Sequence, residues 1–275
     1  MEIIKRFAWV VLLTLCSTTL FVGCSDDDDD NGGKEPEVGG KIDPSNVFTG
    51  KLPKSYAGSA VTYNEEGLVA KIVTEDEEVT FTYPSVTTKA SSAKQVIRMT
   101  IFYPDYPEEG KMYLDMTIGD SGYVENCKET YEKDSDIDTW EFGYNSDGQL
   151  NYMMRSENDN RKTRITYTNG DITKIEETSD INEHYVGTVS YGTTPIENKG
   201  CIMLFDTTFS IDMDEMQFAY LAGLLGKATK HLPVLYTDES NNDSSYECSF
   251  EWNLDSNSYP TSMTSDGHDY PFSWQ

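Results

Sequence analysis

The sequence predicts a mainly β protein: a curved antiparallel up-and-down sheet, or a partly closed barrel of hairpins, with one buried helix near 212–226. Three observations predict this fold. Apolar and polar side chains alternate through most of the chain after residue 45, hairpin-turn dipeptides separate the alternating segments, and a single segment changes to helical spacing.

The alternating segments have apolar side chains at every second position. Successive side chains of a strand point to opposite faces, so these residues share one face, while Thr80, Glu141 and Thr166 lie on the other. One buried and one solvated face is typical of antiparallel sheet. The segments are Val79-Phe81-Tyr83, Ile101-Tyr103, Trp140-Phe142-Tyr144, Ile165-Tyr167, Val189-Tyr191 and Phe250-Trp252.

The residues between these segments independently predict hairpin turns. Asp147-Gly148, Asn169-Gly170 and Asp266-Gly267 are favoured in two-residue hairpin turns, in which both central residues need positive φ. A degenerate repeat joins turns to strands: an aromatic residue such as Tyr144 or Tyr167 ends a strand, and a glycine follows a few residues later. The spacing indicates about one hairpin per unit.

The segment from Asp212 to Gly226 departs from the strand pattern. Asp212 with Glu215 forms a capping box, and Gly226 provides a C-terminal stop. The apolar stripe is wide, which predicts a helix buried against the sheet. Its residues at helical spacing are Met213, Met216, Tyr220, Leu221, Leu224 and Leu225, with Phe218 and Ala222 widening the stripe.

The N-terminus has the order of a bacterial secretory signal: Lys5-Arg6, an apolar run over 7–22, then Gly23-Cys24. Leu20 to Cys24 resembles a lipobox, in which the cysteine is acylated and becomes the first residue, although Phe21 departs from the usual pattern. The alternative is an uncleaved anchor helix. We therefore expect a signal peptide (1–23), a lipidated acidic tether (24–45) and a β domain (46–275).

The tether begins with a run of acidic residues. Ser25, Asp26, Asp27, Asp28, Asp29 and Asp30 directly follow the cysteine. This run resembles the export tag that sends Bacteroidetes lipoproteins to the outer face of the outer membrane; the alternative is a solvated linker. The expected location is thus the outer membrane, lipid-anchored and facing the cell exterior.

The charge of the chain bears on its partners. The net charge is −27 in full and −28 from Cys24 onward, because Glu2, Lys5 and Arg6 leave with the signal. Such a surface repels nucleic acid, so nucleic-acid partners are excluded, and membrane attachment has to be covalent. The partners left open are a glycan or another envelope protein.

Taken together, these features resemble a Bacteroidetes surface lipoprotein family of unknown function with a porin-like β fold. The hairpin units resemble the YD-type repeats of bacterial surface proteins, and the segment from Tyr220 to Pro233 supports the family resemblance. The resemblance implies a fold and a cellular address. It provides no catalytic motif.

The residues that resemble catalytic or metal-binding motifs are better explained by non-catalytic roles. Gly119-Asp120-Ser121-Gly122 resembles a protease nucleophile motif, but every histidine lies downstream of the serine, so a hairpin turn is favoured. His184, His231 and His268 show no metal-ligand spacing. No catalytic residue, cofactor or metal ligand is therefore assigned. An unrecognised pair of carboxylates, as in a glycosidase, stays open.

Two further groups leave alternatives open. A surface calcium site could form around Asp134, Asp136 and Asp138, or around Asp238, Glu239 and Asp243, although neither segment is an EF-hand. Cys127, Cys201 and Cys248 could form one disulfide and a thiol, or stay free and buried. Sugar-stacking candidates are Tyr103, Tyr106 and Tyr259, which lie beside prolines.

The functional interpretation is a non-catalytic binding or structural module of the bacterial envelope. The first alternative is a membrane-embedded β-barrel, against which several alternating segments are short for a membrane-spanning strand. The second alternative is an unrecognised hydrolase.

Overall fold

The fold was analysed in a computed structural model of the 275-residue chain. The structure describes residues 42–84, 94–156, 160–181, 183–239 and 246–275. Residues Glu37–Gln275 form one compact unit. The proposed signal peptide and tether up to residue 41 lie outside the described residues, and the first element, η1 (Pro44–Asn46), begins two residues before the expected start of the β domain.

Seventeen strands of the described residues form one antiparallel sheet, which confirms the predicted fold class. They are β1 (Pro53–Tyr56), β2 (Ser59–Tyr63), β3 (Val69–Val73), β4 (Glu78–Thr82), β5 (Val96–Phe102), β6 (Lys111–Ile118), β7 (Val124–Tyr131), β8 (Ile137–Tyr144), β9 (Leu150–Arg155), β10 (Arg161–Thr168), β11 (Asp171–Thr178), β12 (His184–Ser190), β15 (Leu235–Asp238), β16 (Tyr246–Ser249), β17 (Glu251–Leu254), β18 (Pro260–Ser265) and β19 (His268–Trp274).

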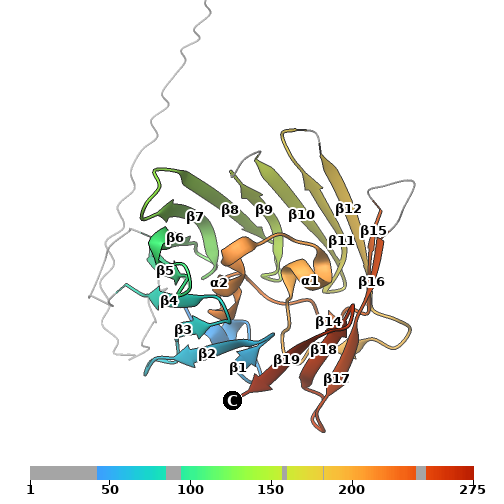
Figure 1. The fold of residues 1–275 in the computed structure, drawn as a ribbon. Coiled ribbons are helices and arrows are strands. Elements are labelled where there is room, and N and C mark those ends of the chain that lie inside the picture. The colour runs from blue at the N-terminus through green and yellow to red at the C-terminus, as the bar shows by residue number, and fades with distance from the viewer. Residues whose placement is uncertain (1–41, 85–93, 157–159, 182, 240–245) are drawn as a thin grey trace, which may run out of the picture. The chain divides into compact units, whose positions relative to one another are not determined.

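The sheet nearly closes into a barrel, because β1 pairs with both β2 and β19 (Figure 1). From β1 to β12 each strand pairs with the next one along the chain, and β12 pairs with β15. The ring changes partners at Phe250. There β16, which pairs with β15, continues directly into β17, which pairs with β18.

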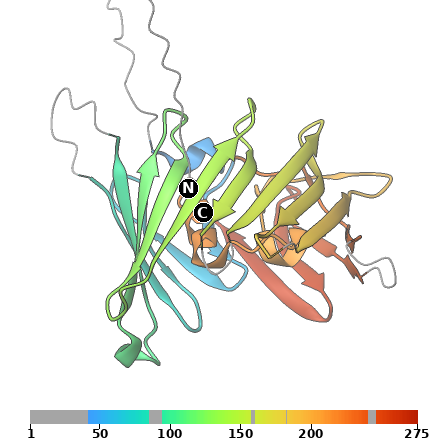
Figure 2. The ribbon, with the colours of Figure 1, turned by 90° about the horizontal axis from the view of Figure 1, so that it is seen from above.

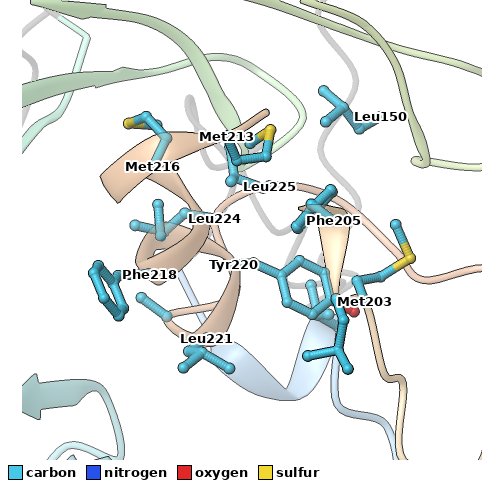
Figure 3. Close-up of a cluster of buried hydrophobic side chains, with 14 of the residues drawn as sticks. Leu150, Met203, Phe205, Met213, Met216, Phe218, Tyr220, Leu221, Leu224 and Leu225 are labelled. Carbon is cyan, nitrogen blue, oxygen red and sulfur yellow. The ribbon is translucent and has the colours of Figure 1, made fainter. Parts of the chain in front are cut away.

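The chain between β12 and β15 fills the interior of this barrel, and we call it the inner segment (191–234). Its elements are β13 (Ile196–Glu197), α1 (Phe205–Phe209), η3 (Asp214–Met216), α2 (Gln217–Leu221) and β14 (His231–Leu232). Its helices α1 and α2 lie inside the ring of strands in both ribbon views (Figures 1 and 2). Its apolar side chains pack together with the inward residues of the strands in a single core (Figure 3).

The helix expected at 212–226 is buried as predicted but much shorter. One 3-10 turn, η3, leads into five residues of α helix, α2, and the helical α1 precedes them. Gly223 and Gly226 have φ of +76° and +80°, and a Cβ at Gly223 would lie 2.6 Å from Pro44. The close approach of η1 therefore ends the helix early. No helix among the described residues is long and apolar enough to cross a membrane.

The aromatic residue of the repeat has a clear structural role, which we call the aromatic latch. At the end of a strand, its polar atom donates a hydrogen bond to the carbonyl at the start of the preceding strand, as from Tyr144 to Val124 at 2.7 Å. Each latch closes the open end of one hairpin. Within the described parts of the chain, six hairpins have it, through Tyr63, Tyr83, Tyr144, Tyr167, Tyr191 and Trp274.

The turns agree with the sequence in most cases. Asn169-Gly170 and Asp266-Gly267 have positive φ at both residues, as two-residue hairpins require. At Asp147-Gly148 only the glycine has positive φ, so the predicted two-residue turn is wrong there. The Asn145 side chain instead accepts the N–H groups of Asp147 and Gln149 and stabilises a longer loop.

Candidate functional site at the mouth of the barrel

The two ends of the barrel differ. In an up-and-down sheet alternate turns fall at the same end, and the inner segment enters and leaves at one of them. We call that end, with the turns after β2, β6, β8, β10 and β17, the capped end. The other end, with the turns after β1, β3, β5, β7, β9, β11 and β18, is the mouth.

The capped end is closed by hydrogen bonds from the inner segment. The backbone N–H groups of Lys227 and Lys230 donate to the carbonyls of Gly148 and Gly170 in two hairpin turns. The buried Gln149 side chain donates to Gly170 and Ala228. The hollows above this end, about 590 and 420 Å³, are wide and shallow. They therefore lie outside the closed cap rather than leading into the barrel.

The cap also uses a histidine with a charged partner. His231 Nδ1 lies 2.7 Å from a carboxylate oxygen of Asp171, and its backbone N–H donates to the other oxygen. Both interactions attach β14 to the first residue of β11. The arrangement fixes the inner segment, and His231 has a structural role here.

The mouth is lined by polar side chains above the apolar core. The buried Arg155, from the end of β9, holds the loop between α1 and η3 and the first residue of η3. Its guanidinium lies 2.5 Å from Asp214 and 3.7 Å from Asp212, and it lies over the ring of Trp140 at 4.7 Å from the centroid. Asp214 has a positive φ of 45°. The ion pair thus holds a backbone conformation that an aspartate tolerates better than most residues.

A second carboxylate lies beneath this pair. Glu129, only 1% exposed, accepts hydrogen bonds from the indole of Trp140 and the hydroxyl of Tyr131. A buried carboxylate is costly unless it is hydrogen-bonded, and these two donors compensate for its burial. Trp140 therefore connects Glu129 to Arg155.

Glu215 is the most perturbed acid of the mouth. The hydroxyl of Tyr103 donates to its Oε1 at 2.7 Å, and its Oε2 has no hydrogen-bond partner among the described residues. Burial, and then the neighbouring Asp214, raise the pKa of Glu215 to about 8. The carboxyl is therefore largely neutral at pH 7. Burial likewise raises the pKa of Glu77, in a mouth turn.

Two cavities flank α1 at the mouth. One, of about 180 Å³, lies against β10, β11, β12 and β15 and is lined by Arg161, Glu177, Tyr185 and Asp238 among others. The other, of about 220 Å³, lies against β1, β2 and β19. Asp206 of α1 lines both, and burial followed by the charge of Asp212 raises its pKa. The mouth can therefore hold small ligands on either side of α1.

The structure places the sequence candidates apart from one another. Tyr103 lies at the mouth, the exposed Tyr106 lies in the loop after β5, and Tyr259 packs on Trp274 at the capped end with Lys51 over its ring. Ser121 belongs to the turn after β6, as expected, and accepts the N–H of Tyr123. His184 and His268 are exposed.

The predicted lipid site and export tag stay predictions, because Cys24 and the residues from Ser25 to Asp30 lie outside the described residues. So does Asp243 of one calcium candidate. Asp134, of the other, caps its own turn by accepting the N–H groups of Ser135 and Asp136. Within the described ranges, no three acidic, histidine or cysteine residues are grouped as metal ligands would be.

The three cysteines among the described residues are free. Cys127 and Cys248 are buried and Cys201 is partly buried. Burial raises the pKa of the Cys127 and Cys201 thiols, which keeps them protonated. Of the two alternatives that the sequence left open, the structure has the free thiols.

The sequence did not single out Arg155, Asp206 or Glu215 as a group. Arg155 continues the inward face of β9, whereas the two acids belong to the inner segment, which follows much later in the chain. The sequence does contain one indication of this site. Arg155 occupies a position of the strand whose neighbours on the same face are apolar, and a charge buried there requires a partner of opposite charge.

Comparison with known proteins gives a family. Residues 60–262 match the family described as a domain of unknown function (DUF4595) with porin-like fold. The chain belongs to this family. A crystal structure of a porin-like protein from Bacteroides uniformis ATCC 8492 is similar to the DUF4595 chain, with a TM-score of 0.55 and 16% identity over 79% of this chain and 90% of that one. At that identity the likeness concerns the fold alone. No curated protein matches the DUF4595 chain.

Proposed function

We propose that this DUF4595 protein is a lipoprotein on the outer face of the bacterial outer membrane, where it displays a non-catalytic barrel that binds its ligand at the mouth. The observation that carries the proposal is the polarity of the barrel. Its interior is apolar and filled by the inner segment, and its outer face is polar. A filled interior favours binding over conduction.

The outer face supports a barrel that lies outside the bilayer. Arg98, Asp115 and Lys128 are cross-strand neighbours at the middle of β5, β6 and β7, and all three point outward. Arg98 and Asp115 form an ion pair at 2.7 Å. In a transmembrane barrel this position carries an apolar band, and each basic residue at the bilayer midplane costs about 2–4 kcal/mol. Attachment through acyl chains on Cys24 avoids that cost.

The anchor is tested by replacing the segment 1–24 with a signal peptide that is cleaved without lipidation. The exported protein should leave the membrane fraction without detergent, whereas the parent should stay there and carry acyl chains on Cys24 by mass spectrometry. Retention of the unlipidated protein in the membrane fraction would instead support the embedded barrel.

The export tag is tested separately. Replacing Asp26 to Asp30 with alanine should preserve lipidation but protect the domain from protease added to intact cells. Equal protease sensitivity of variant and parent would indicate that the aspartates are only a solvated spacer.

A further inference from the structure

The cavity beside β1 and β19 has walls of two kinds. Part of the lining consists of buried apolar residues of the inner segment, including Phe205, Phe218 and Leu221. Tyr56 belongs to the same group, and its hydroxyl already accepts the N–H of Met203 at 2.6 Å. These residues therefore present apolar surface to a ligand.

The rest of the lining is rich in polar groups. Ser59, Asp206, Thr207, Gln217 and Tyr270 line the cavity, and their side chains make no hydrogen bond or ion pair within the described parts of the chain. They come from β2, α1, α2 and β19. Four elements thus bring hydroxyl, amide and carboxylate groups to one small space. Tyr270 also contributes a partly exposed aromatic ring.

These walls restrict the ligand. Among the described residues that line the cavity there is no lysine, arginine or histidine, which disfavours an anion. A wholly apolar ligand would remove water from five polar side chains without replacing their hydrogen bonds, which is costly. A volume of about 220 Å³ is below the range of about 300–1,000 Å³ for drug-sized ligands, so a single ring fits best.

We propose that this cavity binds one ring of a neutral sugar. This inference rests on the proposed function, in which the mouth is the binding end. A sugar ring has apolar C–H faces and a rim of hydroxyls, which match the aromatic and aliphatic groups and the polar groups of the lining respectively. Asp206 and Gln217 are the groups that recognise the hydroxyls, and Tyr270 provides the ring for stacking.

The test uses the chain from Ser25 onward, which retains the whole compact unit Glu37–Gln275. The probes are glucose, galactose, mannose and N-acetylglucosamine, measured by saturation-transfer NMR and calorimetry, with cyclohexanol, glucuronate and spermidine as apolar, anionic and cationic comparisons. At least one neutral sugar should bind and be recovered unchanged. Tyr270→Ala and Gln217→Ala should each weaken binding by about tenfold or more.

The matched control is Tyr106→Ala, which removes an exposed tyrosine at the mouth end outside the cavity and should leave sugar affinity unchanged. Gln217 is exposed, so its variant keeps the test valid if Tyr270→Ala fails to fold. Binding of none of the four sugars, sugar binding that survives both cavity substitutions, or stronger binding of a comparison compound would overturn the inference. The protease assay on intact cells does not depend on sugar binding. A protein that is exposed on the cell surface but binds no sugar would therefore contradict this inference and leave the proposed location intact.

Discussion

At the scale of single residues, the aromatic latches give the aromatic residue of several hairpin units the same structural role. Each latch satisfies a carbonyl at the start of a strand, where the ladder of backbone hydrogen bonds has not yet begun. Burial raises the pKa of Tyr144 and Tyr167 well above the usual value, so both hydroxyls stay protonated as donors.

Removing one latch hydroxyl should therefore be measurable. Tyr144→Phe leaves the Val124 carbonyl without its donor and should lower the free energy of unfolding by about 1–2 kcal/mol in urea titration. Tyr152→Phe is the control, because the hydroxyl of Tyr152 has no hydrogen-bond partner among the described residues. Equal stability of the two variants would mean that the latch contributes through ring packing alone.

Glu215 predicts a dependence of stability on pH. Its pKa of about 8 in the fold exceeds its ordinary value of 4.5, so its contribution to stability is complete below pH 4.5 and is lost as the pH rises through 8. Glu215→Gln cannot ionise and retains an acceptor for Tyr103. Relative to the parent, this variant should gain about 1–3 kcal/mol between pH 5 and pH 9. A stability difference that stayed constant with pH would contradict the assignment.

At the scale of elements, the inner segment shows what a hydrophobic pattern can and cannot predict. The spacing from Met213 to Leu225 correctly predicted a buried segment, because a wide apolar stripe has to be covered on most sides. Its helical length was overestimated. The approach of Pro44 to Gly223, from the opposite end of the domain in sequence, is a tertiary contact that local spacing does not contain.

The burial of this segment predicts the cost of a charge within it. Leu224 is fully buried, and Leu224→Asp should destabilise the fold by about 3–5 kcal/mol in thermal or urea unfolding, because it places a carboxylate among apolar side chains. Leu254→Asp, at a position 38% exposed on β17, is the control and should change stability by less than about 1 kcal/mol. Similar losses in both variants would place the inner segment outside the core.

At the scale of the whole molecule, the alternating pattern was sufficient to predict the up-and-down sheet, since hairpin turns and strand parity are local. Closure of the ring was harder to predict. It depends on β1 meeting β19, and on a change of partner at Phe250 that looks like an ordinary continuous strand in the sequence. The cluster of charged residues at the mouth could not be predicted from the sequence either. Arg155, Glu129 and Asp214 become neighbours only when the barrel encloses the inner segment.

Because β1 and β19 are paired, we expect the protein to tolerate circular permutation, in which the original termini are joined and the chain begins at another turn. Gln275 donates its N–H to Leu52 at 3.0 Å, so the end of β19 lies beside the start of β1. A permuted protein that links residue 275 to residue 42 and begins at Gly267 keeps every strand pair. It should unfold in one transition close to the parent's melting temperature. Two transitions, or a large loss of stability, would show that the order of strands along the chain matters as well as their pairing.

The position of the inner segment in the chain has a consequence for how the protein is made. Twelve of the described strands precede it and the last strands follow it, so during synthesis a long curved sheet emerges before the residues that cover its apolar face. Paired strands without a covered face are exposed to aggregation, and β19 can pair with β1, from the opposite end of the domain, only after the whole domain has been made. The incomplete barrel is thus the form of this molecule that is most prone to aggregation. Its apolar face needs protection by other cellular factors until residues 191–234 have been synthesised.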